Sequence, residues 1–596
     1  MCVITLLTLL TPITKNLALL VGGVVTGKLY PVSISAVRDP RLRPNQVPIP
    51  KRWQEVLSSI FKDRWIAALD REAQSFAIMK VFQEIQADDP GLAAYLKEGH
   101  RILESMIVWS VKNCKEGIVT DFKARVCARG DRRKVGIHHL SAEVYANILM
   151  IKTLRTTLAT ALQDTSTIAT RHWDVKCAFL AGRLKKKIYM RLPPGFPGVK
   201  SKLVLLFGAV YGLPEALRVF TEKLTTKLLS IGFVQSPHDR QVYILRRKEY
   251  WIIIPAFVDD MYPTHNNDAL ALEVFKELSK EFIMKDEGPL KFSLGIAFDI
   301  NYKAGTIAMH QSLLKRDILE ATGKLGCNPT KTPLPGKISL PKELGRDADD
   351  KRHILGQILY LVQGTCPHLS FASSLLSSRV SFWSKDADRA YDHLLRFIAG
   401  DLGQRLIYKR RNNNAPCNLV TFFDADLAGE LPHSPFSRSA FLTFVSGCLV
   451  SWFSKKQPMV ATSTKDAEIM AAYVAATETF WIRGLLSDIG AAEPGPSLMW
   501  TDSAAAKQQA DGEVRHATNK HLLVKYYWTL ELVKNEILAM RRLPSSRNIS
   551  DVLTKSVPKE SFRHNCALML GYMTNDDIRG FPLNDAEAYL SEFAVK

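Results

Sequence analysis

The chain has 596 residues, of which 46% are hydrophobic and 23% are charged. A chain of this length and composition is expected to form several packed cores in about three to four domains, which excludes a largely disordered protein. Lysine and arginine number 79 against 59 aspartates and glutamates, which gives a formal net charge of +20. This surplus favours a polyanionic partner such as nucleic acid, although an ordinary basic protein would also show it.

The nine cysteines include no C-x-x-C pair, so the sequence offers no zinc knuckle or zinc finger. Their wide spacing indicates free thiols in a reducing compartment. Residues 2–14 and 16–27 are uncharged, but each run is shorter than the ~20 residues that a membrane-spanning helix needs. No basic segment precedes the first run, which argues against a signal peptide. Residues 1–49 are therefore expected to be a poorly specified lead-in that ends in a proline-rich linker.

Hydrophobic periodicity predicts alternating helices and strands from residue 53 onward. In chain order we expect a helix at 64–80, a strand at 251–258, a helix at 273–284, strands at 292–301 and 306–310, strands at 419–423 and 440–451, and a helix at 465–489. Between the two halves, residues 409–417 form a polar, asparagine-rich seam. Because such segments commonly link domains, the seam predicts two separable halves, with limited proteolysis cutting between them.

The first half carries aspartates in a pattern that suits nucleotidyl transfer. Asp174 lies in the segment WDVKCAFL, and Asp259 and Asp260 follow an apolar strand in FVDD. Nucleotide transfer uses two divalent metals, one to activate the 3′-hydroxyl and one to neutralise the leaving pyrophosphate. Magnesium prefers oxygen ligands and keeps several waters, so two or three carboxylates suffice. From these residues alone, two unrelated surface turns are the alternative, because aspartate is common in turns.

The second half carries four acids in an order that suits ribonuclease H. Asp424 ends the strand expected at 419–423, and Glu468 lies on the helix expected at 465–489. Asp502 ends the apolar segment LMWTD, and Asp551 opens DVLTK, an expected helix. Ribonuclease H also uses two metals, held by acids on strands and a helix. Taken singly, Asp551 could be a helix N-cap and Glu468 a solvated helix position.

The blocks around these acids resemble the Pol polyprotein of copia-type LTR retrotransposons, in its reverse transcriptase and ribonuclease H region. WDVKCAFLAG, VYGLPEALRVF and FVDD look like the family's D-V-K-x-A-F-L-x-G, L-Y-G-L-K-Q-A-P-R-A-W and Y-V-D-D blocks, and DFKARVCARG looks like Y-K-A-R-L-V-A-K-G. FDADLAG, STKDAEIM and DVLTK are similar to S-D-A-D-W-A-G, S-T-E-A-E-Y and D-I-L-T-K. The resemblance runs in the family's order over about residues 53–575, and such an ordered series is highly specific.

This resemblance implies a multidomain protein of the α+β and α/β classes. A right-hand polymerase with fingers, palm and a short thumb would be followed by a ribonuclease H-like mixed five-stranded sheet with flanking helices. The expected domains are the lead-in at 1–49, the reverse transcriptase fingers and palm at 50–330, the thumb or connection at 331–409, the ribonuclease H-like domain at 418–575 and a C-terminal tail at 576–596.

The resemblance also implies the roles of individual residues. Two Mg²⁺ or Mn²⁺ ions would bind at each site, held by Asp174, Asp259 and Asp260 in the polymerase and by Asp424, Glu468, Asp502 and Asp551 in the ribonuclease H. Arg125, with Lys123 beside it, would contact the incoming triphosphate, since cations suit phosphate oxygens. The backbone amides of Cys177 and Ala178 would cradle the same phosphates. Phe179 would be a steric gate against a 2′-hydroxyl. Taken alone, Phe179 reads as a core aromatic and Arg125 as a solvated strand residue.

Several positions depart from the family pattern and indicate a decaying copy. Pro214 and Glu215 stand where the family has Lys-Gln, and a carboxylate near a triphosphate is repulsive. Pro255 and Pro263 bracket the aspartate pair and are expected to weaken or bulge both hairpin strands. The family's T-R-P-D reads T-C-P-H at residues 365–368, which loses two charges.

Residues and resemblance together predict an RNA-directed DNA polymerase with ribonuclease H activity. Its partners would be an RNA template, a DNA primer, RNA–DNA hybrids and deoxynucleoside triphosphates, with no stable membrane partner, in cytoplasmic virus-like particles and the nucleus. One alternative is a catalytically dead remnant that only binds nucleic acid; a remoter one is a membrane-anchored interaction protein. Because the sequence has no zinc knuckle, protease motif or integrase module, we expect a processed-like fragment or a truncated copy of a polyprotein.

Overall fold

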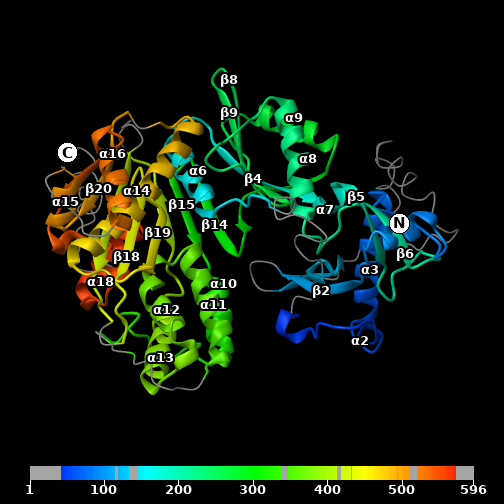
Figure 1. The fold of residues 1–596 in the computed structure, drawn as a ribbon, viewed down its shortest axis with the longest axis horizontal. Helices are drawn as coiled ribbons and strands as arrows, with labels where there is room; N and C mark the ends of the chain where they lie inside the picture. The colour runs from blue at the N-terminus through cyan, green and yellow to red at the C-terminus, as the bar shows by residue number, and fades with distance from the viewer. Residues whose placement is uncertain are drawn as a thin grey trace, which may run out of the picture. The chain divides into compact units, whose positions relative to one another are not determined.

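The computed structural model describes residues 42–113, 118–132, 145–336, 338, 340, 347–411, 418–430, 433–492, 494–510, 512 and 520–571. Most of the expected lead-in, most of the seam at 409–417 and the whole expected C-terminal tail lie outside these residues. The chain divides into two compact units (Figure 1): unit 1 is Met1–Ala146 with Cys177–Lys223, and unit 2 is Asn147–Lys176 with Leu224–Lys596. Among the described helices, none combines the length and the apolar character needed to cross a membrane.

Unit 1 contains two small antiparallel sheets and the helix α3 (Lys62–Ile78). One sheet is the hairpin of β2 (Ser105–Asn113) and β3 (Val119–Ala128); the other has the order β1 (Phe82–Glu84), β6 (Leu203–Gly208), β5 (Arg183–Arg191). The remaining elements are η1 (Pro44–Gln46), α2 (Trp53–Leu57), α4 (Pro90–Lys97), η2 (Gly130–Arg132), α7 (Ala178–Ala181) and α8 (Ala216–Ile231), the last of which continues into unit 2. Alternate residues of β3 are buried, which leaves its charged side chains on the other face.

The palm sheet begins unit 2. β4 (Ala169–Lys176) pairs on one side with β12 (Ile283–Pro289) and on the other with β10 (Asp260–Met261) and β11 (Thr264–His265). β10 and β11 also pair with β9 (Tyr250–Phe257), which is followed in the sheet by β8 (Val242–Arg247) and β7 (Val234–Gln235). The palm helices are α6 (Ile151–Gln163) and α9 (Asp268–Ser279). This sheet carries all three of the expected polymerase aspartates.

We call residues 292–409 the connection, which lies between the palm and the ribonuclease H-like sheet in the chain and includes the thumb or connection expected at 331–409. A four-stranded sheet has the order β13 (Phe292–Ser293), β14 (Ile296–Asn301), β15 (Thr306–His310), β16 (Leu406–Lys409). Its helices are α10 (Ser312–Ala321), α11 (Asp349–Gly364), η3 (Pro367–Leu369), α12 (Ser370–Ser377), η4 (Val380–Phe382) and α13 (Lys385–Gly400). Because β16 returns to pair with β15 after α13, the end of the connection is tied back to its beginning.

The C-terminal part of unit 2 is a mixed five-stranded sheet with the order β19-β18-β17-β20-β21. Strands β17 (Leu419–Asp426), β18 (Arg438–Val445) and β19 (Cys448–Lys456) are antiparallel, whereas β20 (Ser497–Thr501) and β21 (Leu538–Arg542) run parallel to β17. The helices are α14 (Thr464–Asp488), α15 (Ala504–Ala510), α16 (Lys520–Lys534), η5 (Ser545–Arg547), α17 (Asp551–Thr554) and α18 (Lys559–Met569). This arrangement confirms the expected ribonuclease H-like fold.

Most of the expected elements are confirmed, and three have wrong bounds. The strand expected at 292–301 is two antiparallel strands, β13 and β14, because Leu294 and Gly295 adopt φ values of 51° and 64° and form a turn between them. The helix expected at 273–284 begins earlier, because the Asn267 side chain caps it by accepting from the backbone N–H of Leu270 at 2.8 Å. It ends at Ser279, and the following apolar residues pair with β4 as β12. The single strand expected at 440–451 is a hairpin, because Ser446 and Gly447 adopt φ values of 48° and 78° and form a two-residue turn.

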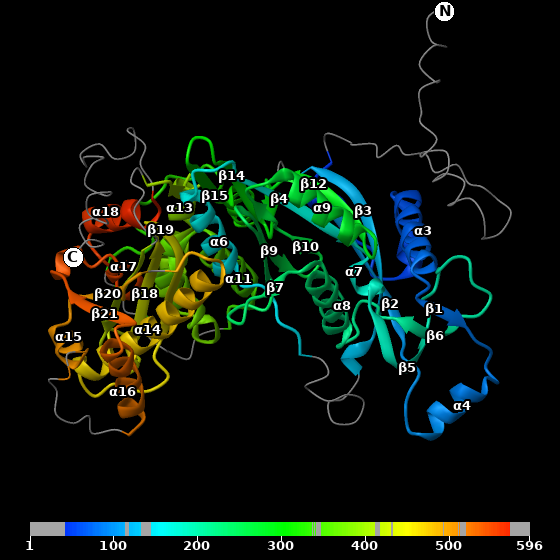
Figure 2. The same cartoon turned by 90° about the horizontal axis from the view of Figure 1, so that it is seen from above.

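One continuous hydrophobic core runs through unit 2. It joins apolar residues of α6, of the palm strands β8 and β9, of α11 to α13 and of the strands β17 to β19. A second core lies between the same ribonuclease H-like sheet and α14 with α16, and includes Phe423, Phe441, Ala471 and Ala475. Figure 2 shows α6 beside β19, with α14 near both. The palm and the ribonuclease H-like sheet therefore share apolar packing.

Candidate active sites

The three polymerase aspartates lie on adjoining parts of the palm sheet. Asp174 on β4 stands directly opposite Asp260 on β10 in the antiparallel register, so their side chains project from the same face. Asp259 lies in the turn between β9 and β10, and its carbonyl accepts a hydrogen bond from the N–H of Val175 at 2.8 Å. The fold thus brings Asp174 together, at one place in the sheet, with two aspartates that are 85 and 86 positions further along the sequence.

The turn that carries Asp259 is strained. Val258 has φ 57°, in the left-handed region that β-branched residues avoid, and such strain persists only where the surroundings impose it. We expected both flanking prolines to disturb the hairpin strands, and only one of them does. Pro255 stays within β9, paired with Val242, and does not interrupt the strand. Pro263 coincides with the break between β10 and β11.

His172 holds one of the polymerase aspartates. Its Nε2 donates to Oδ1 of Asp260 at 2.6 Å. Burial lowers the pKa of His172, but the hydrogen bond and the negative charge of Asp260 outweigh this and leave the pKa raised. Sequence reasoning missed this residue, although its place two positions before Asp174 on one strand puts both on the same face. Within the described residues, ligand atoms of the three polymerase carboxylates do not all lie within 4.8 Å of one another.

One of the expected triphosphate-binding residues and the expected sugar gate pack on the same tyrosine of unit 1. The Arg125 guanidinium lies 5.5 Å from the ring centroid of Tyr211, and the Phe179 ring packs edge-on against the same ring at 5.1 Å. Lys123 lies on the same face of β3 as Arg125, since they are two residues apart on one strand. Unit 1 therefore contains an arginine and a half-buried phenylalanine organised around Tyr211, which sequence reasoning did not single out.

The other expected substrate-binding residues of unit 1 lie at helix starts. Cys177 has φ 56° and is the N-cap of α7, whose first residue is Ala178. Glu215 immediately precedes α8, and its carbonyl accepts from the N–H of Val219 at 3.0 Å, which makes it the N-cap of that helix. A carboxylate at a helix N-terminus is favourable for the helix. Glu215 therefore has a structural role as well as the expected unfavourable effect on nucleotide binding.

Residues 365–368, which depart from the family pattern, lie in a buried polar cluster of the connection. Ligand atoms of Cys366, His368 and Asp401 lie within 4.8 Å of one another. The ammonium of Lys315 is already among them, 2.6 Å from Oδ2 of Asp401, and both side chains are almost fully buried. A lysine cation therefore balances the charge of the buried aspartate.

Three of the four expected ribonuclease H acids form a tight cluster. Asp424 lies on the central strand β17 and is 3% exposed, Asp502 directly follows the neighbouring parallel strand β20, and Asp551 is the first residue of α17. Carboxylate oxygens of these three residues lie within 4.8 Å of one another. Glu468 on α14 is 4% exposed, and its Oε2 has no hydrogen-bond partner among the described residues.

Three polar residues around the cluster fix the acids. Thr554 Oγ1 donates to Oδ2 of Asp424 at 2.5 Å, and Asn548 Nδ2 donates to Oδ1 of Asp502 at 3.1 Å. The Lys555 ammonium lies 3.1 Å from Oδ1 of Asp551 and 3.8 Å from Oδ2 of Asp424. Thr554 and Lys555 belong to the DVLTK block, so the signal for them was present in the sequence.

The cluster has the electrostatics of a cation site. Burial raises the pKa of Asp424 to about 7 and, together with the charges of Asp424 and Asp502, raises the pKa of Glu468 to about 9. Burial also raises the pKa of Asp551. Buried carboxylates this close repel one another unless a cation neutralises them, and Lys555 supplies only one positive charge. The donor set, all carboxylate oxygen, fits Mg²⁺ or Mn²⁺.

We expect the metal-free protein to lose stability as the pH rises from about 5 to 9. The folded-state pKa values of about 7 for Asp424 and about 9 for Glu468 lie above the ordinary 3.8 and 4.5, so the folded state binds more protons than the unfolded state in this window. Asp424→Asn should therefore stabilise the metal-free protein at pH 8, by about 1 kcal/mol or more. Thermal unfolding in EDTA from pH 5 to 9 measures this, and a difference between variant and wild type that does not change with pH contradicts it.

Known proteins resemble the chain over most of its length. Residues 94–335 match the family described as reverse transcriptase (RNA-dependent DNA polymerase). The chain is 28% identical over 538 residues to the retrovirus-related Pol polyprotein from transposon TNT 1-94 of Nicotiana tabacum, which covers 88% of this chain and 39% of the relative. It is 26% identical over 540 residues to the Pol polyprotein from transposon RE2 of Arabidopsis thaliana, with coverage of 90% and 35%. It is 30% identical over 227 residues to an uncharacterized mitochondrial protein of Arabidopsis thaliana, with coverage of 38% and 92%.

The chain thus spans well under half the length of the two Pol polyproteins it matches, and nearly the whole of the mitochondrial protein. The family match ends at residue 335, near the start of the thumb or connection expected at 331–409, whereas the Pol matches cover most of this chain. On these matches and its own fold, the chain belongs to the copia-type retrotransposon Pol family and contains its reverse transcriptase domain, followed by a ribonuclease H-like fold.

Proposed function

We propose that this chain is an RNA-directed DNA polymerase and ribonuclease H that uses two divalent metal ions at each site. The observation that carries the proposal is the partly buried cluster of Asp424, Asp502 and Asp551, with ligand atoms within 4.8 Å of one another. Buried like charges at that spacing are costly without a bound cation. The net charge of +20 suits the phosphate backbones of an RNA template, a DNA primer and their hybrid.

At the ribonuclease H site, Asp424, Glu468, Asp502 and Asp551 would hold Mg²⁺ or Mn²⁺. The metal ions supply activation of the attacking water and stabilisation of the charge that develops on the cleaved phosphate. Thr554 and Asn548 keep the carboxylates of Asp424 and Asp502 oriented through their hydrogen bonds. Glu468 presents a buried oxygen that the described residues leave unpartnered, as expected for an acid whose partner is a bound cation.

At the polymerase site, Asp174, Asp259 and Asp260 would hold the ions that activate the primer 3′-hydroxyl. Arg125 and Lys123 would bind the triphosphate of a deoxynucleotide, and Phe179 would exclude the 2′-hydroxyl of a ribonucleotide. The common packing of Arg125 and Phe179 on Tyr211 supports this assignment, because it gives both side chains a fixed position. A metal ion held by Asp260 would compete with the hydrogen bond from His172.

A remnant that binds RNA–DNA hybrids without catalysis is the second candidate. Two observations favour it, and both concern the polymerase site. Glu215 stands where the family has a glutamine, and the carboxylate of Asp260 accepts a hydrogen bond from His172. The ribonuclease H acids show no comparable defect. We therefore expect ribonuclease H activity to be better preserved than DNA synthesis.

Glu215→Gln is expected to improve nucleotide binding in DNA synthesis. Two unit charges about 6 Å apart repel by roughly 3 kcal/mol at an effective dielectric of about 20, before metal ions and salt screen them. If a third of this repulsion, about 1 kcal/mol, remains after screening, the KM for deoxynucleotides should fall about fivefold in the variant. Loss of the N-cap charge should cost α8 only a few tenths of a kcal/mol, which separates the two roles of Glu215.

The control for this prediction is Glu222→Gln on the same helix. Glu222 pairs with Arg218 one turn away and also loses one negative charge on substitution. Its KM should stay at the wild-type value. An equal fall in KM in both variants would show that general charge matters rather than position 215, and an unchanged KM in Glu215→Gln would show that this carboxylate does not act on the nucleotide.

The proposed function is tested on the full chain with a DNA primer annealed to an RNA template. We expect Mg²⁺ to support both extension of the primer by deoxynucleotides and shortening of the RNA, and EDTA to abolish both. Hybrid binding measured in EDTA separates the two candidates. Binding without extension or RNA cleavage in Mg²⁺ or Mn²⁺ would support the remnant and overturn the enzyme.

A further inference from the structure

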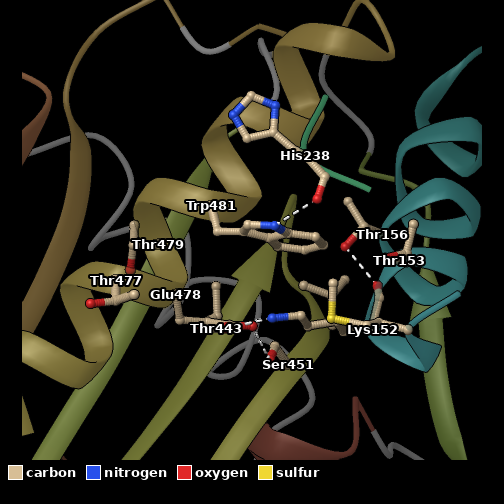
Figure 3. A network of polar contacts seen from close by, with 12 residues as sticks. Lys152, Thr153, Thr156, His238, Thr443, Ser451, Thr477, Glu478, Thr479 and Trp481 are labelled. Atoms are coloured by element: carbon tan, nitrogen blue, oxygen red, sulfur yellow. Dashed lines mark hydrogen bonds and ion pairs between the residues drawn. The ribbon is translucent and has the colours of Figure 1, made fainter. Parts of the chain in front are cut away.

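Helix α6 is buried on almost every side between the palm and the ribonuclease H-like sheet. Nine of its residues are buried, among them three threonines and Arg155, so it does not have the single apolar stripe of a surface helix. It contacts β9 and β11 in the palm as well as β19 and α14. Figure 3 shows α6 next to α14, with Lys152 reaching toward Glu478.

Arg155 binds the connection and the ribonuclease H-like sheet at once. Its side chain is 6% exposed, and its Nε donates to the carbonyl of Val450 at 2.8 Å. Val450 is the extra residue of a bulge in β19, a position that a bulge leaves out of the strand ladder. The Nη1 group donates to the carbonyls of Gln363 and Gly364 at 3.0 and 2.8 Å. These belong to the last turn of α11, whose carbonyls lack partners within the helix.

Trp452 completes this contact. Its Nε1 donates to the carbonyl of Val362 at 2.8 Å, so a ribonuclease H side chain satisfies another carbonyl at the end of α11. The Arg155 guanidinium lies 3.7 Å from the centroid of the Trp452 ring. A planar cation stacked on an indole and bonded to three carbonyls is held in one position. The palm, the connection and the ribonuclease H-like sheet therefore meet at one guanidinium.

A second set of contacts joins α6 to α14 (Figure 3). Lys152 Nζ donates to Oε2 of Glu478 at 2.7 Å, and Ser451 Oγ donates to the other oxygen of that carboxylate at 2.5 Å. The same ammonium lies 4.1 Å from the ring centroid of Trp481. Trp481 Nε1 in turn donates to the carbonyl of His238 at 3.0 Å. Both ends of this ion pair are mostly buried, so solvent screens it little.

Close approach between α14 and the palm depends on a glycine. A Cβ at Gly484 would lie 2.0 Å from Nε2 of His238. That ring cannot simply move aside, because its Nδ1 donates to Oδ2 of Asp488 at 2.9 Å and its backbone carbonyl receives Trp481. A glycine inside a helix is otherwise unfavourable by comparison with alanine. The docked arrangement explains why position 484 carries one.

We propose that Arg155, with Lys152 and the Gly484 contact, locks the palm, the connection and the ribonuclease H-like fold into one rigid body. Only five residues separate α6 from β4, the strand of Asp174, and β19 is two strands from Asp424 on β17. The clamp therefore fixes the distance between the two sets of metal-binding acids. Where the proposed function holds, ribonuclease H cuts the RNA at a fixed number of base pairs behind the growing DNA end. A protease should then be able to cut the chain within residues 409–417, but the two resulting fragments should stay bound to each other.

Cleavage at the seam tests the rigid body without any activity. A protease site placed within residues 412–417 of the full chain should be cut, and the two fragments should co-elute in gel filtration without denaturant. Arg155→Met, which keeps the volume but removes the donors, should let the nicked fragments separate, and Arg155→Lys should do so less completely. Separation of the wild-type fragments under the same conditions overturns the proposal.

Two matched glycine variants guard against a general folding defect. Gly484 and Gly356 both lie inside helices, but a Cβ at Gly356 would meet no atom within 4 Å. Gly356→Ala should raise the melting temperature by about 1 °C, the gain expected from alanine in a helix of a unit of this size. Gly484→Ala should lower it and promote separation of the nicked fragments. Equal stabilisation by both variants would show that α14 is not docked on His238.

The position of RNA cleavage tests the effect on the proposed reaction. With a hybrid whose DNA 3′ end is fixed, the wild type should give one narrow cluster of RNA cuts, and nicked Arg155→Met should spread them while still cutting. A purely structural role would lower the amount of cutting without moving it. An unchanged narrow cluster in a variant whose fragments separate overturns the register claim. If no cutting occurs at all, the proposed function fails, while the gel-filtration and melting results still decide the rigid body.

Discussion

Replacing Asp502 by asparagine is expected to abolish ribonuclease H cleavage and leave DNA synthesis intact. The substitution keeps the shape of the side chain but removes one of the negative charges gathered within 4.8 Å. Removal of a single group that stabilises charge at an active site commonly costs about 10²–10³ in rate, and a metal ligand should cost at least as much. Cleavage of a labelled RNA strand in a preformed hybrid, compared with primer extension by the same preparation, measures both halves of the expectation.

Asp268→Asn is the control for Asp502→Asn. Its side chain is 86% exposed in the first turn of α9, and it loses the same charge outside the cluster. The control should cleave RNA at the wild-type rate. Because Asn548 donates to Asp502 and can equally donate to the oxygen of an asparagine, the variant should fold normally. Undiminished cleavage by Asp502→Asn would remove this residue from the metal site.

Replacing Asp174 by asparagine is expected to have the reciprocal effect, with DNA synthesis lost by about a hundredfold or more and RNA cleavage retained. Asp174 stands opposite Asp260 on the neighbouring strand, so its charge contributes to the only place in the described palm sheet where three of the expected acids adjoin. The measurement is single-nucleotide primer extension in Mg²⁺, with RNA cleavage in a preformed hybrid as the internal reference.

The matched control for Asp174 is Asp286→Asn on the adjoining strand β12. Asp286 pairs with Arg171, has a side chain exposed to 29% against 24% for Asp174, and lies opposite Trp173 in the register. Its loss tests whether any missing charge on this sheet disturbs synthesis. If Asp286→Asn and Asp174→Asn reduce extension equally, the assignment of Asp174 as a metal-binding acid does not hold.

The local signals of this fold could be read from the sequence because they depend on neighbours in the chain. The strand before Asp259 and the helix that carries Glu468 both follow from hydrophobic periodicity. The positions of the four expected ribonuclease H acids could also be predicted, since each lies at the end of an element or within a recognisable block. Turns were harder to predict from the sequence. Ser446 adopts a left-handed backbone in the turn between β18 and β19, but it is not a glycine, so the first position of this turn gave no signal.

Contacts between distant segments could not be predicted, because tertiary packing decides them. Arg155 and Val450 are 295 positions apart, and His172 and Asp260 are 88 apart. A buried arginine inside an apparently ordinary helix gives no sign of which carbonyls it will meet. The polar seam at 409–417 likewise suggested two independent halves, since composition reveals a linker but not a core that continues past it.

The most direct test of the central claim, that one chain carries two working metal sites on one frame, is a single reaction on an RNA–DNA hybrid with a different label on each strand. In Mg²⁺ with deoxynucleotides, the DNA should lengthen while the RNA shortens at a constant distance behind the DNA end. Asp174→Asn should stop only the first process and Asp502→Asn only the second. If neither strand changes length although the hybrid is bound, the chain is a binding remnant and the account is wrong.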